Sequence, residues 1–117
     1  MLGDRTEHVD LLVDSVDDDR LSAALSAGDF CLQWHDIPKG TFRAMREMLS
    51  KPSGSYQDLT IGKIFGAALL LVEREGIYSF KAIDKRAGAD LLRVDLSQDT
   101  IVGTISALED AVEAWED

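Results

Sequence analysis

The sequence contains few cysteines, prolines and histidines: one, two and two respectively in 117 residues. The single cysteine, Cys31, cannot form a disulfide within the chain, so the apolar core must hold the fold together. A lone cysteine is also compatible with a reducing cytoplasm. No charged segment followed by an apolar one opens the sequence, so it shows no secretory signal. We therefore expect a cytoplasmic protein.

The sequence also lacks the motifs of common catalytic and metal sites. It has no Walker loop, no GxSxG and no HExxH, and His8 and His35 lie far apart without a CxxC pair. The acidic run Asp17–Asp19 resembles half of a calcium loop, which needs a glycine at its sixth position and a glutamate at its twelfth. Counted from Asp14 or from Asp17, neither requirement is met. We expect no metal, no cofactor and no catalytic residue.

Long apolar runs are missing too. The longest, Ile64–Val72, has no polar residue, but it is far shorter than the roughly 20 residues that cross a bilayer. Hydrophobic residues make up 45% of the chain and charged residues 29%, which is typical of a globular protein and argues against disorder. We expect residues 1–117 to form a single domain that does not enter a membrane.

Negative charge is abundant, with a formal net charge of −10. Residues 1–36 hold nine acidic and two basic side chains, and residues 87–117 hold eight and one, whereas residues 37–86 are mildly basic. Such a field repels nucleic acid and anionic membranes but attracts a basic protein. Nucleic-acid or phosphate binding stays a weaker alternative, because no aromatic platform or glycine-rich nest accompanies the basic residues. These are Lys39, Arg43, Arg46, Lys51, Lys85 and Arg86.

The segment Asp58–Glu75 is predicted to be a central buried helix, because an uninterrupted apolar run cannot keep one face in water. Asp58 or Thr60 could cap its start, and Gly76 could end it. Gly62 and Gly66, four residues apart, would let another element approach closely. Within this interpretation Phe65 is a core residue whose loss should be costly.

Helices are also predicted on the N-terminal side of this segment. Apolar residues in 1–28 recur at helical spacing and indicate one or two short helices, with Thr6 and the Asp17–Asp19 run as caps. Residues 30–35 alternate weakly and favour a short strand. A second helix is expected after Asp36 as cap and Pro38 in the first turn. Its buried stripe would be Phe42, Met45 and Leu49, with Lys39, Arg43 and Arg46 on the opposite side.

After Gly76 the apolar period changes to two, which predicts strands at Ile77–Asp84 and Ala89–Leu96 joined as a hairpin. Ser97 or Asp99 would then cap a final amphipathic helix. The predicted fold is α+β: a small single domain with a central buried helix and flanking helices packed on a β-hairpin or small antiparallel sheet. Because an isolated hairpin is marginal, a third strand should come from residues 30–35 or from a second copy, so a homodimer is possible.

The final helix suggests the function. Its outer face carries Glu109, Asp110, Glu113 and Glu116, with like charges four residues apart and negative charge at a helix C-terminus, both locally unfavourable. We predict that these four residues bind a protein partner, possibly basic, in a small inhibitor, immunity or chaperone-like module. Solubility alone could also explain this charge. So could neutralisation within the fold by the Lys39, Arg43 and Arg46 stripe.

The alternative is an orphan small enzyme or ligand-binding domain. Cys31, His35 and Asp36 are the only candidates for nucleophilic catalysis. On a strand Cys31 and His35 would point the same way but stand about 13 Å apart at ~3.3 Å per residue, too far for a thiol–imidazole pair. We therefore expect a buried cysteine, a partly exposed histidine and no catalysis.

Overall fold

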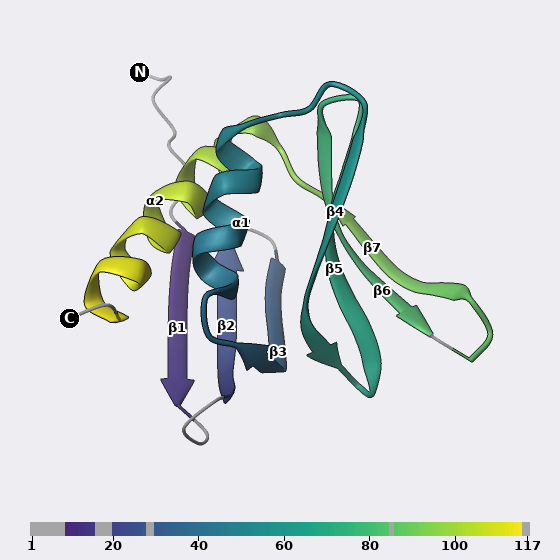
Figure 1. The fold of residues 1–117 in the computed structure, drawn as a ribbon, viewed down its shortest axis with the longest axis horizontal. Helices are drawn as coiled ribbons and strands as arrows, with labels where there is room; N and C mark the ends of the chain where they lie inside the picture. The colour runs from purple at the N-terminus through teal and green to yellow at the C-terminus, as the bar shows by residue number, and fades with distance from the viewer. Residues whose placement is uncertain (1–8, 16–19, 28–29, 85, 116–117) are drawn as a thin grey trace.

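The computed structural model describes residues 9–15, 20–27, 30–84 and 86–115. They form one antiparallel sheet of seven strands, curled into a half-barrel, with two helices on its concave side (Figure 1). Each strand pairs with its neighbours in the sequence. The strands are β1 (Val9–Ser15), β2 (Arg20–Ala27), β3 (Phe30–Pro38), β4 (Tyr56–Ile64), β5 (Ala67–Arg74), β6 (Ile77–Asp84) and β7 (Ala89–Asp95). The helices are α1 (Thr41–Ser50), between β3 and β4, and α2 (Gln98–Trp115), after β7.

The predicted α+β fold with a central buried helix is wrong. The segment Asp58–Glu75 forms most of β4 and all of β5, which pair from Tyr56 with Arg74 to Ile64 with Ala67. The run is apolar on both faces of β5, which lies between β4 and β6: from Leu69 onward, buried residues alternate with the half-buried Leu70 and Val72. A buried strand and a buried helix can share such a run, and here length was a poor guide because a turn divides it.

That turn consists of Phe65 and Gly66, whose backbone φ angles of 50° and 81° are both left-handed. Positive φ at both central residues is typical of the tight type I′ hairpin. The prediction of a core phenylalanine is therefore wrong: Phe65 is 95% exposed at the hairpin tip. A bulky residue is rare in this conformation, so the turn was hard to recognise from the sequence.

The predicted N-terminal helices are strands. In β1 the partly buried residues are Val9, Leu11 and Val13, whereas Leu12 is 70% exposed. β2 alternates strictly between buried and less buried residues along its length, which is the pattern of a strand covered on one face. Thr6 and the Asp17–Asp19 run lie outside the described residues.

The strand predicted at residues 30–35 is present and continues to Pro38, so Asp36 and Pro38 belong to β3 and do not begin a helix. Asp36 has a φ of 59° and forms ion pairs with Arg20 and Lys63, at 2.6 and 3.3 Å. Helix α1 begins after Gly40, without a side-chain cap. Its predicted buried stripe is confirmed for Phe42, Met45 and Leu49.

The C-terminal predictions are confirmed. β6 and β7 form the expected hairpin, with β7 ending at Asp95. Ser97 caps α2, because its Oγ accepts a hydrogen bond from the Thr100 backbone N–H at 3.2 Å. The buried side of α2 includes Ile101, Leu108 and Val112, although Val102 is more than half exposed.

Helices α1 and α2 pack on each other, and α2 also packs on β1 while α1 contacts β4 (Figure 1). The largest buried side chains between helices and sheet come from seven elements, so the concave side holds one continuous core. They include Leu21, Leu25, Ile37, Met45, Ile61, Leu69, Leu71, Phe80 and Leu108. In the described part of the chain, neither helix has the length and apolar character needed to cross a membrane.

The join between β3 and β4 is narrow and depends on one glycine. The two strands pair only at His35 and Lys63. Beside this pair the Trp34 Nε1 donates a hydrogen bond to the Ile61 carbonyl at 3.2 Å. A Cβ on Gly62 would lie 2.6 Å from Trp34 Cδ1, so only glycine permits this contact. The predicted close approach thus occurs at Gly62, although the element is a strand; Gly66 has no such neighbour.

Candidate functional site

The predicted partner-binding residues lie on the exposed side of α2. Glu109, Asp110 and Glu113 are all exposed, and none forms an ion pair with a residue that the structure describes. Glu116 lies outside the described residues. Since α2 is held by its apolar side against β1 and α1, these three carboxylates face away from the core.

The fold gathers acidic segments that are distant in the sequence. Residues 1–36 and 87–117 carry the negative excess, and among the described residues the packing of α2 on β1 brings one part of each segment together (Figure 1). Exposed Asp10 and Asp14 stand on β1 itself. The mildly basic middle of the chain forms α1 and the strands β4 to β6 instead.

The proposed neutralisation of this face by Lys39, Arg43 and Arg46 does not involve the three described carboxylates. Lys39 lies in the turn before α1, Arg43 is exposed and Arg46 is half-buried. The ion pairs between described residues lie on the sheet, where Asp36, Asp90 and Asp95 meet cations from neighbouring or the same strands. Glu109, Asp110 and Glu113 therefore have no ion-pair partner among the described residues.

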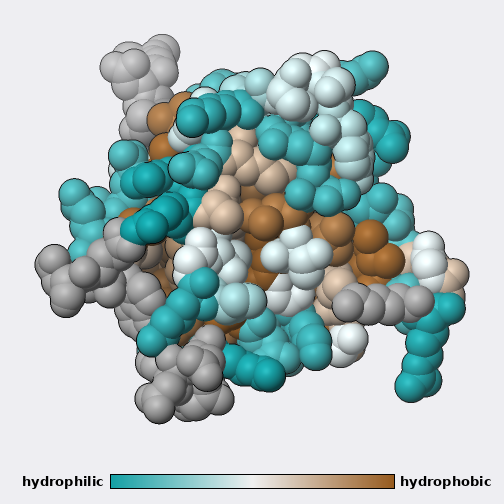
Figure 2. Space-filling view, viewed as in Figure 1, coloured by the Kyte–Doolittle hydropathy of each residue, from teal (hydrophilic) through white to brown (hydrophobic). Residues whose placement is uncertain are grey.

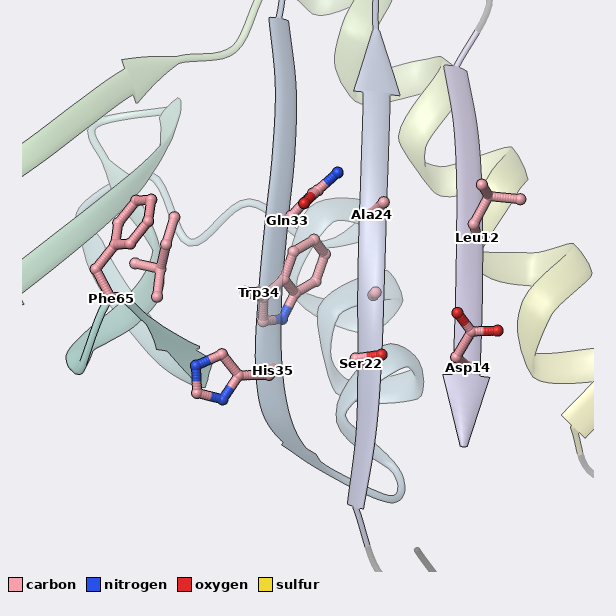
Figure 3. Close-up of a pocket in the computed structure, with 10 residues that line it drawn as sticks. Leu12, Asp14, Ser22, Ala24, Gln33, Trp34, His35 and Phe65 are labelled. Carbon is pink, nitrogen blue, oxygen red and sulfur yellow. The ribbon is translucent and has the colours of Figure 1, made fainter. Parts of the chain in front are cut away.

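A groove on the convex side of the sheet was not expected from the sequence. It has a volume of about 640 Å³ and runs across β1, β2 and β3 to the β4–β5 turn (Figure 3). Its apolar lining includes the exposed Leu12 and Phe65, from opposite ends. The bulges that offset β2 from β3 and β4 from β5 shape this region, and such irregularities leave no trace in composition.

Three polar groups in this groove are of the residue types found in a Ser-His-Asp catalytic triad, but they are not arranged as one. Asp14 lies directly opposite Ser22 at the bulge of β2, and the His35 ring points away from Ser22, toward the side of Phe65 (Figure 3). A serine nucleophile needs the imidazole between itself and the carboxylate. Here the serine stands between the other two groups. The arrangement can orient a polar ligand group but is not built to activate a nucleophile.

Cys31 is exposed, which corrects the expectation of a buried cysteine. Its Sγ accepts a hydrogen bond from Ser26 Oγ at 3.4 Å. His35 is exposed four positions further along the same strand, so the separation expected for a strand holds. Neither residue thus offers the other a catalytic partner. Within the described residues, no group of three or more histidine, cysteine or acidic side chains could hold a metal ion.

One carboxylate, Glu73, is fully buried on β5. Its Oε1 accepts hydrogen bonds from Ser53 N–H at 2.8 Å, Ser53 Oγ at 3.1 Å and Gln57 Nε2 at 2.6 Å. Its Oε2 accepts from Gly54 N–H at 3.0 Å and Gly76 N–H at 3.2 Å. The Ser53 N–H bond, with the others, outweighs the burial and lowers the pKa of Glu73 to about 2.

All five donors on Glu73 are neutral, and together they use both oxygens fully. No lone pair faces a cavity, so this carboxylate has no position in which to accept a substrate proton. It ties the loop after α1 to the turn between β5 and β6. The pKa of Glu73 is shifted more than that of any other described acid, but the role of this carboxylate is structural: it fixes the backbone of the loop and the turn.

No family model, curated protein or solved structure matches the chain significantly. The function must therefore be argued from the surfaces described above.

Proposed function

We propose that the protein is a small non-enzymatic binding module that takes a basic protein partner on the acidic face of α2. This face is defined by Glu109, Asp110 and Glu113. The observation that carries the proposal is their exposure without an ion pair to any described residue, on the side where α2 meets acidic β1. Complementary charge of this kind accelerates association and selects partners of opposite sign.

The local energetics favour a use for this charge. Glu109 and Glu113 are like charges one helical turn apart, which costs a few tenths of a kcal/mol. Within the described residues no basic side chain offsets this cost. A partner that brings lysines and arginines would turn the repulsion into attraction.

The test uses the variant Glu109→Gln with Glu113→Gln, and the protein captured from a lysate of the source organism by the wild type. The isolated variant should be as stable as the wild type or more stable by a few tenths of a kcal/mol, because the like-charge pair is gone. Its association rate with the captured protein should fall, and the wild-type affinity should weaken as salt rises from low to physiological levels.

A matched control removes two exposed charges elsewhere: Glu47→Gln with Glu75→Gln, on α1 and the β5–β6 turn. This variant should bind like the wild type, because the acidic face of α2 is intact, although its net charge is the same as that of the test variant. A destabilised Glu109/Glu113 variant with unaltered binding would instead show that these residues serve the fold. Equal weakening in both variants would reduce the effect to net charge.

A second candidate is a ligand-binding domain, favoured by the convex groove. A concave apolar lining with a few polar groups is the usual form of a small-molecule site, and Asp14, Ser22 and His35 supply the polar groups here. A screen of small aromatic fragments, followed by amide chemical shifts, tests this candidate. Saturable shifts confined to the groove support it, and shifts scattered over the surface count against it.

A further inference from the structure

The sheet has two open edges, β1 and β7, because neither strand has a second neighbour among the described residues. An open edge presents unpaired backbone N–H and C=O groups that can pair with another chain. Natural proteins usually protect such edges with charge, bulges or a covering element. The two edges differ in how far they are protected.

The β1 edge is guarded against self-pairing. Its middle residue is Leu12, with Asp10 and Asp14 two positions away on either side. If two copies paired antiparallel about Leu12, Asp10 of each copy would lie opposite Asp14 of the other. Like charges directly opposite each other are destabilising, and this register would create two such pairs. Helix α2 also packs on this strand, through its apolar side.

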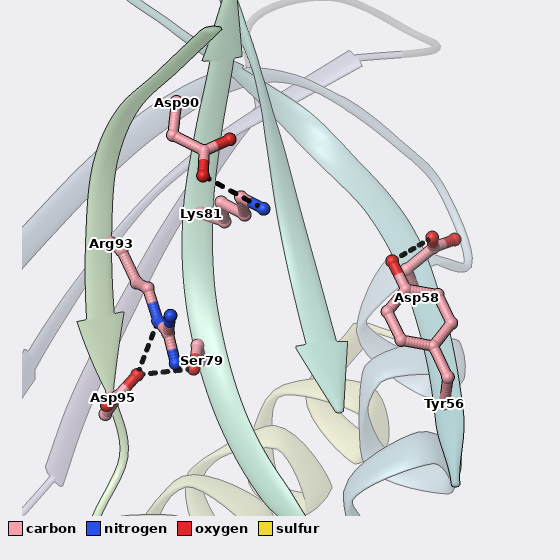
Figure 4. Close-up of polar contacts among 7 residues, drawn as sticks. All are labelled: Tyr56, Asp58, Ser79, Lys81, Asp90, Arg93 and Asp95. Atoms are coloured by element: carbon pink, nitrogen blue, oxygen red, sulfur yellow. Dashed lines mark hydrogen bonds and ion pairs between the residues drawn. The ribbon is translucent and has the colours of Figure 1, made fainter. Parts of the chain in front are cut away.

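The β7 edge exposes two leucines at its middle, and its charges are already paired. Its middle residue is Leu92, 38% exposed, and the neighbouring Leu91 is 59% exposed. Asp90 forms an ion pair with Lys81 at 3.1 Å, and Asp95 accepts hydrogen bonds from Arg93 and Ser79 (Figure 4). Figure 2 shows apolar surface extending from the centre of the molecule toward β6 and β7.

The inner face near β7 is also incompletely covered. Leu92 lies opposite Ala82 of β6, and Val94 lies opposite Phe80. Ala82 and Phe80 are buried, whereas Leu92 and Val94 are exposed or half-buried. The helices pack at the other end of the sheet, against β1 and β4. The buried core therefore ends at β6 and does not include β7.

We propose that two copies of this chain pair antiparallel through β7, about a two-fold axis beside Leu92. In this register the two Leu92 side chains meet, Arg93 lies opposite Leu91 of the second copy, and Asp90 lies opposite Val94. No like charges stand opposite each other, in contrast to the β1 edge. The contact is isologous, so it closes after two copies and does not propagate into a fibre. It joins two seven-stranded half-barrels into a continuous sheet and covers the exposed leucines.

The dimer has a characteristic salt dependence. Each chain carries a net charge of −10, so two copies repel each other at long range, while the residues nearest the axis are leucines and the charges of β7 are paired. Salt screens the repulsion, and the dimer should strengthen as salt rises. Binding of a basic partner to α2 should weaken over the same range. Opposite salt dependences therefore separate this inference from the proposed function, and either can fail alone.

Sedimentation equilibrium over a concentration series, at low and high salt, tests the dimer. Wild-type protein should show a reversible monomer–dimer equilibrium that shifts toward dimer at high salt. Leu91→Lys with Leu92→Lys should raise the dissociation constant by at least about tenfold, because lysine charges would be buried without partners. The control is Leu12→Lys, at the middle of the other edge and 70% exposed, which should leave the dimer intact.

A wild-type protein that stays monomeric at every concentration and salt overturns the proposal. A dimer that Leu12→Lys disrupts and the β7 variant preserves overturns it too, by moving the contact to β1. A second measurement stands even if the lysine variant fails to fold. Leu92→Cys in a Cys31→Ser background should form a disulfide-linked dimer on mild oxidation, because residue 92 meets itself at the axis. The matched Leu12→Cys variant should not, and the reverse result contradicts the proposal.

Discussion

The two edges of the sheet differ in charge and in cover, and this difference would keep the two proposed contacts apart. On the β1 side, α2 covers the strand, and Glu109, Asp110 and Glu113 are exposed without ion pairs to described residues. On the β7 side, the strand is uncovered, its charges are paired internally, and leucines are exposed. The first surface suits a partner of opposite charge and the second suits an identical copy, so the two contacts need not compete.

The comparison also shows that some exposed charged side chains are already paired within the fold. Asp90 and Asp95 are as exposed as the carboxylates of α2, yet each already has a partner on β6 or β7 (Figure 4). Net charge by region, as counted from the sequence, does not distinguish these cases. Pairing does, and it follows from the register of the strands.

The prediction with the largest expected effect tests whether the β1 side and the β7 side of the sheet share one core. Phe80→Ala, beneath the β7 edge, should cost about 3–5 kcal/mol, and Leu25→Ala, in β2 near the β1 edge, about 2–5 kcal/mol, since both side chains are fully buried. Urea denaturation should show single transitions with similar slopes for both variants. A Phe80→Ala protein that loses less than about 1 kcal/mol, or unfolds in two steps, would mean that the β7 side is a separate and weaker unit.

An effect of intermediate size is expected in the pH dependence of stability, which should distinguish the buried Glu73 from the carboxylates on the surface. The pKa of Glu73 is lowered to about 2 from an ordinary 4.5. Its contribution to stability is therefore fully present above about pH 4.5 and is lost as the pH falls from there toward 2. Denaturation midpoints measured across this window should fall for the wild type. Glu73→Gln should be less stable than the wild type at neutral pH and should lose less in the same window.

The matched control for that measurement is Glu109→Gln, which removes an exposed carboxylate from α2. It should follow the wild-type pH profile closely. If Glu73→Gln kept the full acid sensitivity, the hydrogen bonds around this carboxylate would contribute little to stability.

The smallest expected effect concerns Phe65, which lies between the two edges at the β4–β5 turn. Phe65→Asn should stabilise the protein by about 0.5–1 kcal/mol, because asparagine followed by glycine favours the left-handed turn and a 95% exposed ring loses no burial. Thermal unfolding measures this directly. A destabilised variant would show that the Phe65 ring packs more than its exposure indicates.

Elements with one dominant period could be predicted from the sequence. The β6–β7 hairpin alternates clearly and has a glycine in its turn, and α2 has a serine cap and a repeating apolar stripe. The buried stripe of α1 was predicted correctly, although the residue at which this helix begins was not. In both helices the burial of one face imposes the pattern that the residues show, whereas β7 is mostly exposed along its length.

The rest of the fold could not be predicted, for identifiable reasons. β5 carries apolar residues on both faces, including the half-buried Leu70 and Val72, so its sequence shows no polar alternation, and a phenylalanine occupies a turn position where asparagine is expected. In β1 the exposed Leu12 adds an apolar residue at helical spacing from Val9 and Val16. At the candidate site, the acidic residues of α2 are visible in the sequence. The pairing of other acids, the convex groove and the open edge all depend on strand register.

The packing of α2 on β1 has a consequence for how the chain acquires its structure. Every strand pairs with its sequence neighbour, so the sheet can grow by short steps as the chain emerges from a ribosome, where N-terminal segments fold first. The inner side of β1, however, is covered by α2, which is synthesised after all seven strands. During synthesis that apolar strip is the longest-lived exposed surface of the nascent sheet, and the acids of β1 would then deter premature pairing between neighbouring chains.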